Sequence, residues 1–163
     1  MTSDSPFIQG YPAEWVEKAH AAKARGDLEA TLLAHHPQPN DITDNARLNT
    51  YVQTLKRTHM KKAPPLSKIR YCEKISTLNR ALGLHTYVVR QQGNKLKRKN
   101  ELRVASVFKD LPKSFLEMIV VHELAHLRHK DHDKAFYRLC KHMLPDYHQL
   151  EWELRLMLFA RHR

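Results

Sequence analysis

Apolar and polar positions in the N-terminal third of the chain alternate with the spacing of a helix. Between positions 12 and 63, apolar side chains recur three or four residues apart, which places them on one helical face. We therefore expect residues 1–63 to form an N-terminal helical region. Its longest helix is expected to begin at a cap on Asp41 or Thr43. Pro64-Pro65 is expected to end that helix, because proline cannot continue the helical hydrogen-bond ladder.

The middle of the chain shows the shorter period of strands. Ser67–Cys72 is expected to form one strand and Ile75–Leu82 a short helical turn. Two further β-prone runs, Thr86–Gln91 and Glu101–Phe108, are separated by a polar connection that begins with Gly93-Asn94. A connection of this kind is typical of a hairpin, so we expect the two runs to pair in antiparallel fashion.

A third pattern follows, in which apolar residues surround almost the whole circumference of a helix. It covers Phe115–Leu127, and Pro112 before it suits a helix start. Such a helix is normally buried, yet this one contains His122, Glu123 and His126. Burying ionisable groups without partners is costly or shifts their pKa values, so we expect a specific partner to satisfy them.

Two more helices are expected after this segment. Asp133 is placed to cap a helix that runs to Leu144, and Pro145 should end it. A last helix is expected from Tyr147 to Ala160. These elements predict an α+β fold with a small, mainly antiparallel sheet, in which residues 64–163 form the core and pack with the N-terminal region as one compact unit.

Composition and cysteine usage narrow the class of protein. With 163 residues, 42% of them hydrophobic, the chain has the composition of one folded domain. No apolar stretch is long enough to cross a bilayer, and residues 1–6 lack a signal pattern, so we expect a cytoplasmic protein without a membrane partner. Cys72 and Cys140 form no CxxC pair, which favours reduced thiols over a disulfide or a thiolate zinc site.

Charge adds a possible class of partner. The chain has 28 Lys and Arg against 17 Asp and Glu, a formal charge of +11, which would attract an anionic partner. The densest basic run lies within Lys95–Lys99. We interpret this run as a solvated hairpin tip, with steering of an anionic substrate as the alternative.

The strongest chemical signal is the sequence His122-Glu123-Leu124-Ala125-His126. The two histidines are one helical turn apart, roughly 6 Å on one face, so both imidazoles can reach a single ion. Zinc, or another divalent metal, would activate water at such a site. Glu123 follows His122 around the helix and is expected to act as the general base. In the alternative interpretation, the two histidines are core residues hydrogen-bonded to neighbouring groups.

A catalytic zinc site usually has three protein ligands. We expect His132 to be the third, because it precedes the cap at Asp133, where the chain must turn back over the helix end. His129 is the competitor, but it would lie about 10.5 Å along the helix axis from His122. Glu151 and Glu153, on the last helix, are weaker alternatives. Candidates for stabilising an oxyanion, each with a core role as the alternative, are Tyr137, His142, Tyr147 and His148.

The residues from about Pro64 to His148 resemble the YgjP-like metallopeptidase family, relatives of the zincins. The resemblance rests on Arg103-Val104-Ala105, on Ile119–Leu127, and on His132 followed four residues later by Phe136. It implies a zincin-like fold in which His122, His126 and His132 bind the metal and Glu123 is catalytic. By the same analogy, the strand from Leu102 to Phe108 would border the cleft and could pair with an extended substrate.

These observations predict a zinc-dependent hydrolase of the HExxH type, in which activated water attacks a carbonyl group and Glu123 is the general base. A peptide is the expected substrate, which makes the chain a metallopeptidase. The first alternative is a nucleotide substrate, with the same centre hydrolysing a phosphoanhydride as a nucleoside triphosphate pyrophosphatase; the basic charge favours this substrate. The second is a non-enzymatic, nucleic-acid-associated module with a structural metal.

Overall fold

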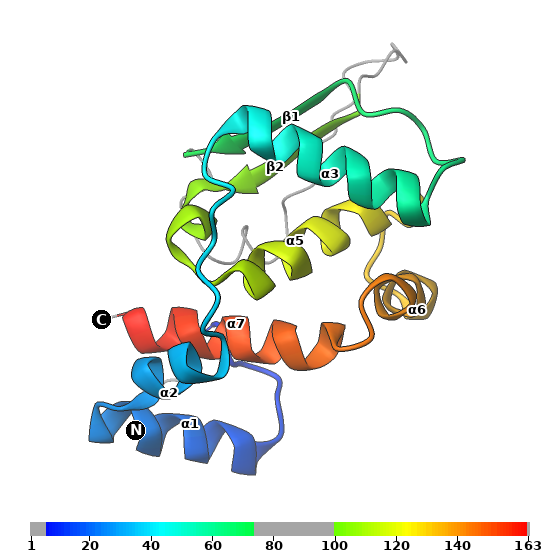
Figure 1. The fold of residues 1–163 in the computed structure, drawn as a ribbon. Coiled ribbons are helices and arrows are strands. Elements are labelled where there is room, and N and C mark those ends of the chain that lie inside the picture. The colour runs from blue at the N-terminus through cyan, green and yellow to red at the C-terminus, as the bar shows by residue number, and fades with distance from the viewer. Residues whose placement is uncertain (1–5, 74–99, 163) are drawn as a thin grey trace.

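The computed structural model describes residues 6–73 and 100–162 (Figure 1). Helices make up most of this part of the chain and accompany a two-stranded sheet, which confirms the expected α+β class. No helix within the described ranges is long and apolar enough to cross a membrane. In chain order the elements are α1 (Ala13–Arg25), α2 (Leu28–His35), α3 (Asn45–His59), β1 (Lys68–Cys72), β2 (Glu101–Ala105), the 3-10 helix η1 (Ser106–Asp110), α5 (Lys113–Ala125), α6 (Lys134–Met143) and α7 (Tyr147–Arg161).

The N-terminal helices differ from expectation at the ends of α3. The cap is Asp44, whose side chain accepts a hydrogen bond from the backbone N–H of Arg47, so the expected cap at Asp41 or Thr43 is wrong. Asp44 fills this role because it has extended backbone geometry and stands three residues before the N–H that it binds. The helix ends at His59, before Pro64-Pro65, so the diproline follows the helix rather than ending it.

The described strands correct the expected direction of the sheet. β1 and β2 are parallel, with Ile69 opposite Leu102 and Cys72 opposite Ala105, so a mainly antiparallel sheet is wrong for the described residues. Parallel strands need a crossover connection of a dozen or more residues, and residues 73–100 separate these two strands. Arg70 donates to Glu101 across the pair at 2.8 Å. The expected strand also ends early, since the chain turns into η1 after Ala105.

Several sequence expectations lie outside the described residues. They are the helical turn Ile75–Leu82, the strand Thr86–Gln91, the connection at Gly93-Asn94 and the basic run Lys95–Lys99.

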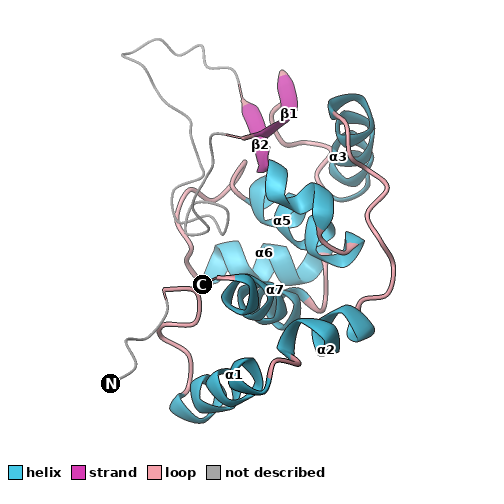
Figure 2. Ribbon diagram, turned by 90° about the vertical axis from the view of Figure 1, so that its left-hand side faces the viewer, coloured by secondary structure: helices cyan, strands magenta, loops and turns pink. Residues whose placement is uncertain are grey.

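Helix α5 occupies the centre of the molecule. The sheet and α3 lie on one side of it and α7 lies on the other, with α1 and α2 beyond α7 (Figures 1 and 2). All residues from Phe115 to Ala125 except Glu117 are buried, as the apolar circumference predicted. The C-terminal end of α5 therefore carries its polar residues into the protein interior.

The two C-terminal helices begin as expected. The side chain of Asp133 accepts a hydrogen bond from Phe136 N and caps α6. After α6 the chain passes Pro145 and starts α7 at Tyr147, which is fully buried. Both α6 and α7 pack on α5, and Tyr147, the first residue of α7, contacts His122 near the C-terminal end of α5.

Candidate metal centre

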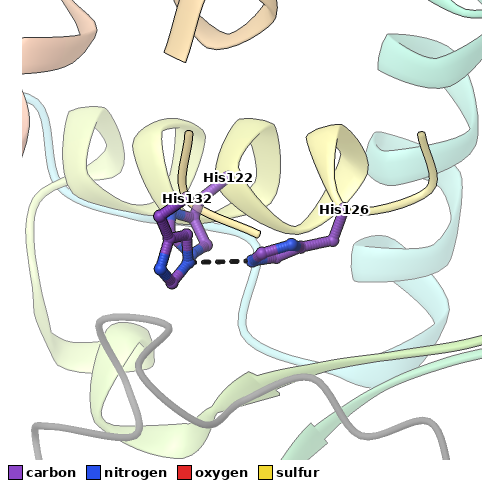
Figure 3. Close-up of side chains that lie close together, drawn as sticks. All are labelled: His122, His126 and His132. Carbon is purple, nitrogen blue, oxygen red and sulfur yellow. Dashed lines mark hydrogen bonds between the residues drawn. The ribbon is translucent and has the colours of Figure 1, made fainter. Parts of the chain in front are cut away.

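Three histidines converge beside the end of α5 (Figure 3). His122 lies in the last turns of α5, His126 caps its C-terminus, and His132 lies in the short connection before α6. One ring nitrogen from each of the three lies within 4.8 Å of the others. The Nε2 atoms of His126 and His132 are 3.1 Å apart. Side chains of this type in such a cluster could hold one metal ion.

His122, His126 and His132 are called the His triad below. The turn after α5 positions two of them, His126 and His132. The ladder of α5 stops at Ala125, and the next backbone N–H groups form tighter bonds, with His126 donating to Glu123 and Leu127 to Leu124. This tightening reverses the chain, so that His132 returns to the helix end. The structure thus brings together the three histidines that the sequence singled out.

His129 contributes its backbone to this arrangement, and its side chain is not part of the cluster. Its carbonyl oxygen lies 3.0 Å from His126 Nδ1 and can only accept a hydrogen bond. Nδ1 of His126 must therefore carry the proton. In the neutral ring this leaves the lone pair on Nε2, the atom that faces His132.

One ring nitrogen of His122 contacts Tyr147, and the other is available to the cluster. Nδ1 of His122 is 2.7 Å from the hydroxyl oxygen of Tyr147. Nε2 is buried and has no hydrogen-bond partner among residues 6–73 and 100–162. A buried polar atom without a partner is costly, and a metal ion would satisfy it. The donor atoms present therefore fit a bound metal.

Burial keeps the imidazoles in the form that binds metal. Burial lowers the pKa of His126 to about 4, in opposition to its hydrogen bond with the His129 carbonyl, and His132 lowers it further. Burial also lowers the pKa of His122 well below its usual range, and His126 and His132 add to this effect. Both rings are therefore neutral near pH 7, which metal coordination requires.

Glu123 accompanies the His triad in the same turn of α5. Its side chain is only 7% exposed. Burial, with smaller contributions from Glu151 and Glu123, raises the pKa of the Cys140 thiol to about 12. That cysteine therefore remains a thiol at neutral pH, as the sequence suggested for both cysteines.

Comparison with known proteins identifies the family. The sequence model described as "YgjP-like, metallopeptidase domain" matches residues 43–156, more than half of the chain. This chain belongs to the YgjP-like family. It is also 47% identical, over 156 residues, to a protein of Escherichia coli (strain K12) named UTP pyrophosphatase; the match covers 96% of this chain and 93% of that protein. No solved structure matches the chain significantly.

Membership of the YgjP-like family confirms the predicted resemblance and makes the chain a metal-dependent hydrolase. The His triad is the one group of potential metal ligands found in the described part of this YgjP-like chain. The match begins at residue 43 and so includes α3 as well as the residues around the triad.

The carboxylates considered as alternative ligands have other partners. Oε1 of Glu153 is 2.8 Å from Nε2 of His36, and Glu151 pairs with Arg155 at 3.9 Å. Neither carboxylate belongs to the His triad. Sequence reasoning missed the His36 contact, because it joins α7 to the residue that follows α2 and no local spacing signals such a pair.

Of the candidates for stabilising an oxyanion, one contacts the His triad and the others contact further aromatic rings. The hydroxyl of Tyr147 is hydrogen-bonded to Nδ1 of His122. The ring centroids of Tyr137 and His148 lie 5.4 Å apart, and those of His142 and His59 lie 6.5 Å apart. An aromatic residue that the family pattern included, Phe136, packs against all three histidines with centroids between 4.6 and 5.0 Å away. It closes the triad on the side of α6.

Proposed function

We propose that this chain is a metal-dependent nucleoside triphosphate pyrophosphatase that hydrolyses UTP to UMP and pyrophosphate. The observation that carries the proposal is its 47% identity, over nearly its whole length, to a protein named UTP pyrophosphatase. The formal charge of +11 supports an anionic substrate. The His triad supports water activation by a metal.

The metal in this proposal is held by the Nε2 atoms of the His triad. Three imidazoles with an open position are a ligand set that suits zinc, although other divalent ions also bind imidazole. When bound, the ion supplies a Lewis acid that polarises a phosphoryl oxygen and acidifies water. Tyr147 and the His129 carbonyl orient His122 and His126, and so determine which nitrogen each ring presents.

Glu123 is the proposed general base. Its buried carboxylate would accept a proton from the attacking water as the new oxygen–phosphorus bond forms at the α-phosphorus. The bond from that phosphorus to the bridging oxygen breaks, and pyrophosphate leaves. Glu123 would then give this proton to the leaving pyrophosphate oxygen, so that the enzyme ends the cycle unchanged.

Peptide hydrolysis is the second candidate, because the matching family description names a metallopeptidase domain. The same centre would then direct water at a carbonyl carbon, and Glu123 would protonate the leaving amine. The two candidates share the metal and the base and differ only in substrate.

A substrate screen separates the two candidates. Metal-loaded protein is incubated with the four nucleoside triphosphates and with casein, and UMP, pyrophosphate and new amino termini are measured. We expect UTP to give equal amounts of UMP and pyrophosphate, chelation to stop the reaction, and casein to remain intact. Cleavage of casein without any nucleotide hydrolysis would contradict the proposal.

A further inference from the structure

A second concave site lies away from the His triad, between α1, α2 and α7. The cavity measures about 490 Å³, within the range of small-molecule sites. No residue of the His triad lines it. Its walls include an aromatic pair, two basic side chains and small or aliphatic residues, among them Trp15, Lys18, Ala22, Arg25, Leu28 and Trp152.

Two indole rings form the aromatic part of this cavity. Trp15 and Trp152 are the only tryptophans of the chain, and their ring centroids are 5.3 Å apart. Tyr11 supports the pair from outside the cavity, with its ring 4.4 Å from Trp152. Trp15 is nevertheless 43% exposed, which is unusual for so large an apolar side chain. A ring that is fixed by neighbours and open to solvent is a ready platform for another aromatic group.

The charged side chains of the cavity are all basic. Lys18 and Arg25 line it, and no acidic residue of the described ranges does. Arg25 pairs with Asp27 at 3.4 Å, but both side chains are more than half exposed, so water and salt weaken that pair. The cavity therefore favours a ligand with negative charge.

Helix α1 arranges these groups along one line. Trp15, Lys18, Ala22 and Arg25 follow one another at intervals of three or four residues, so they share one helical face. Lys18 and Arg25 are seven residues apart, about 10 Å along the axis. Ala22 stands between them and leaves the space that a larger side chain would fill.

We propose that this cavity binds a nucleotide, with the base stacked on the exposed Trp15 ring beside Trp152 and the phosphate at Lys18 and Arg25. Aromatic faces bind bases of any sequence, and basic side chains bind phosphate, so the combination recognises the unit that free nucleotides and single-stranded RNA share. The site is separate from the metal centre and does not depend on the proposed hydrolysis.

The two tryptophans give this proposal a direct readout, because both line the cavity. Tryptophan emission of the Glu123→Gln protein, treated with chelator, is followed during titration with UMP and with an octamer of uridylate. Uridine and inorganic phosphate serve as separate half-ligands. We expect UMP or the octamer to quench the tryptophan emission saturably. Uridine and inorganic phosphate should each bind at least tenfold more weakly than UMP.

A pair of double variants tests the assigned residues. The double variant Lys18→Ala/Arg25→Ala should raise the Kd for UMP and for the octamer at least tenfold. The double variant Lys61→Ala/Lys62→Ala removes the same charge from an exposed turn elsewhere and should not raise it. Circular dichroism confirms that each variant is folded. An octamer that binds more than tenfold tighter than UMP identifies RNA as the source, and similar affinities identify a free nucleotide. Absence of quenching, or equal Kd values for the two double variants, would overturn the proposal.

Discussion

At the scale of single residues, the site depends on which nitrogen each histidine presents. His122 directs Nδ1 at Tyr147, and His126 directs Nδ1 at the carbonyl of His129, so the Nε2 atoms remain for the metal in both cases. The spacing of His122 and His126 predicted their shared face. Neither orienting contact could be predicted, because one joins separate helices and the other depends on how α5 ends.

Removal of the Tyr147 hydroxyl tests the first of these contacts. Tyr147→Phe should lower metal affinity by about 10- to 100-fold, because His122 loses the group that orients it. Competition with a chromophoric chelator measures this affinity. Tyr137→Phe removes a hydroxyl from the same aromatic cluster without changing that bond, and it should leave metal affinity unchanged. Equal affinity in the two variants would show that Tyr147 is only a packing residue.

The choice between His132 and His129 is also testable at this scale. His132→Ala should remove most of the metal affinity, because it deletes one of the three converging rings. His129→Ala should retain metal, because the contact from this residue comes from its backbone carbonyl. The metal content of each purified variant, measured by mass spectrometry, shows which of the two histidines is the ligand. The opposite pattern would make His129 the ligand.

At the scale of elements, local periodicity predicted helices better than strand pairing. The apolar circumference of Phe115–Leu127 predicted a buried helix, and Asp133 predicted a cap, because both signals lie within a few residues. The pairing of β1 with β2 joins segments separated by residues 73–100. The hairpin that neighbouring β-prone runs suggested involves residues outside the described ranges, and nothing in a local pattern records the direction of a distant partner.

Helix α7 carries a buried carboxyl that should make stability depend on pH. Burial raises the pKa of Glu151, and Arg155 only partly opposes this effect. As the pH rises, the Glu151 carboxyl therefore loses its proton in the unfolded chain before it does so in the folded protein. This favours the unfolded chain, so the folded state loses stability from about pH 4.5 up to the raised pKa. Glu151→Gln cannot ionise, so the wild-type protein should lose stability relative to this variant across that window.

Urea unfolding at several pH values measures this difference in the free energy of unfolding. The comparison uses metal-free protein, so that metal binding does not contribute to the difference. A difference between wild type and Glu151→Gln that stays constant with pH would show that the Glu151 pKa is the same in both states.

At the scale of the whole molecule, family membership gives the class of reaction and the net charge bears on the substrate. The YgjP-like match fixes the class as a metal-dependent hydrolase. The excess of basic residues, visible in the sequence, favours a triphosphate over a neutral peptide. The HExxH pattern describes how water is activated and contains no information on the bond attacked, so the sequence alone did not decide between a peptide and a nucleotide.

The charge makes a prediction about rates. If the field of the protein attracts UTP, kcat/KM should fall several-fold as salt rises from about 0.05 to 0.3 M, because screening shortens the reach of surface charge. The turnover number at saturating UTP should change much less. A kcat/KM that is independent of salt would show that net charge plays no part in capture of the substrate.

The proposed function requires a metal on the His triad and the Glu123 carboxylate to act together on UTP. The most direct test compares Glu123→Gln with Glu117→Gln, a control on the same helix that lies outside the cluster. Metal content and UTP turnover are measured on the same samples. We predict that both variants retain the metal, that Glu117→Gln retains activity, and that Glu123→Gln loses about 10²- to 10⁴-fold in kcat. Undiminished turnover in metal-loaded Glu123→Gln would contradict the account.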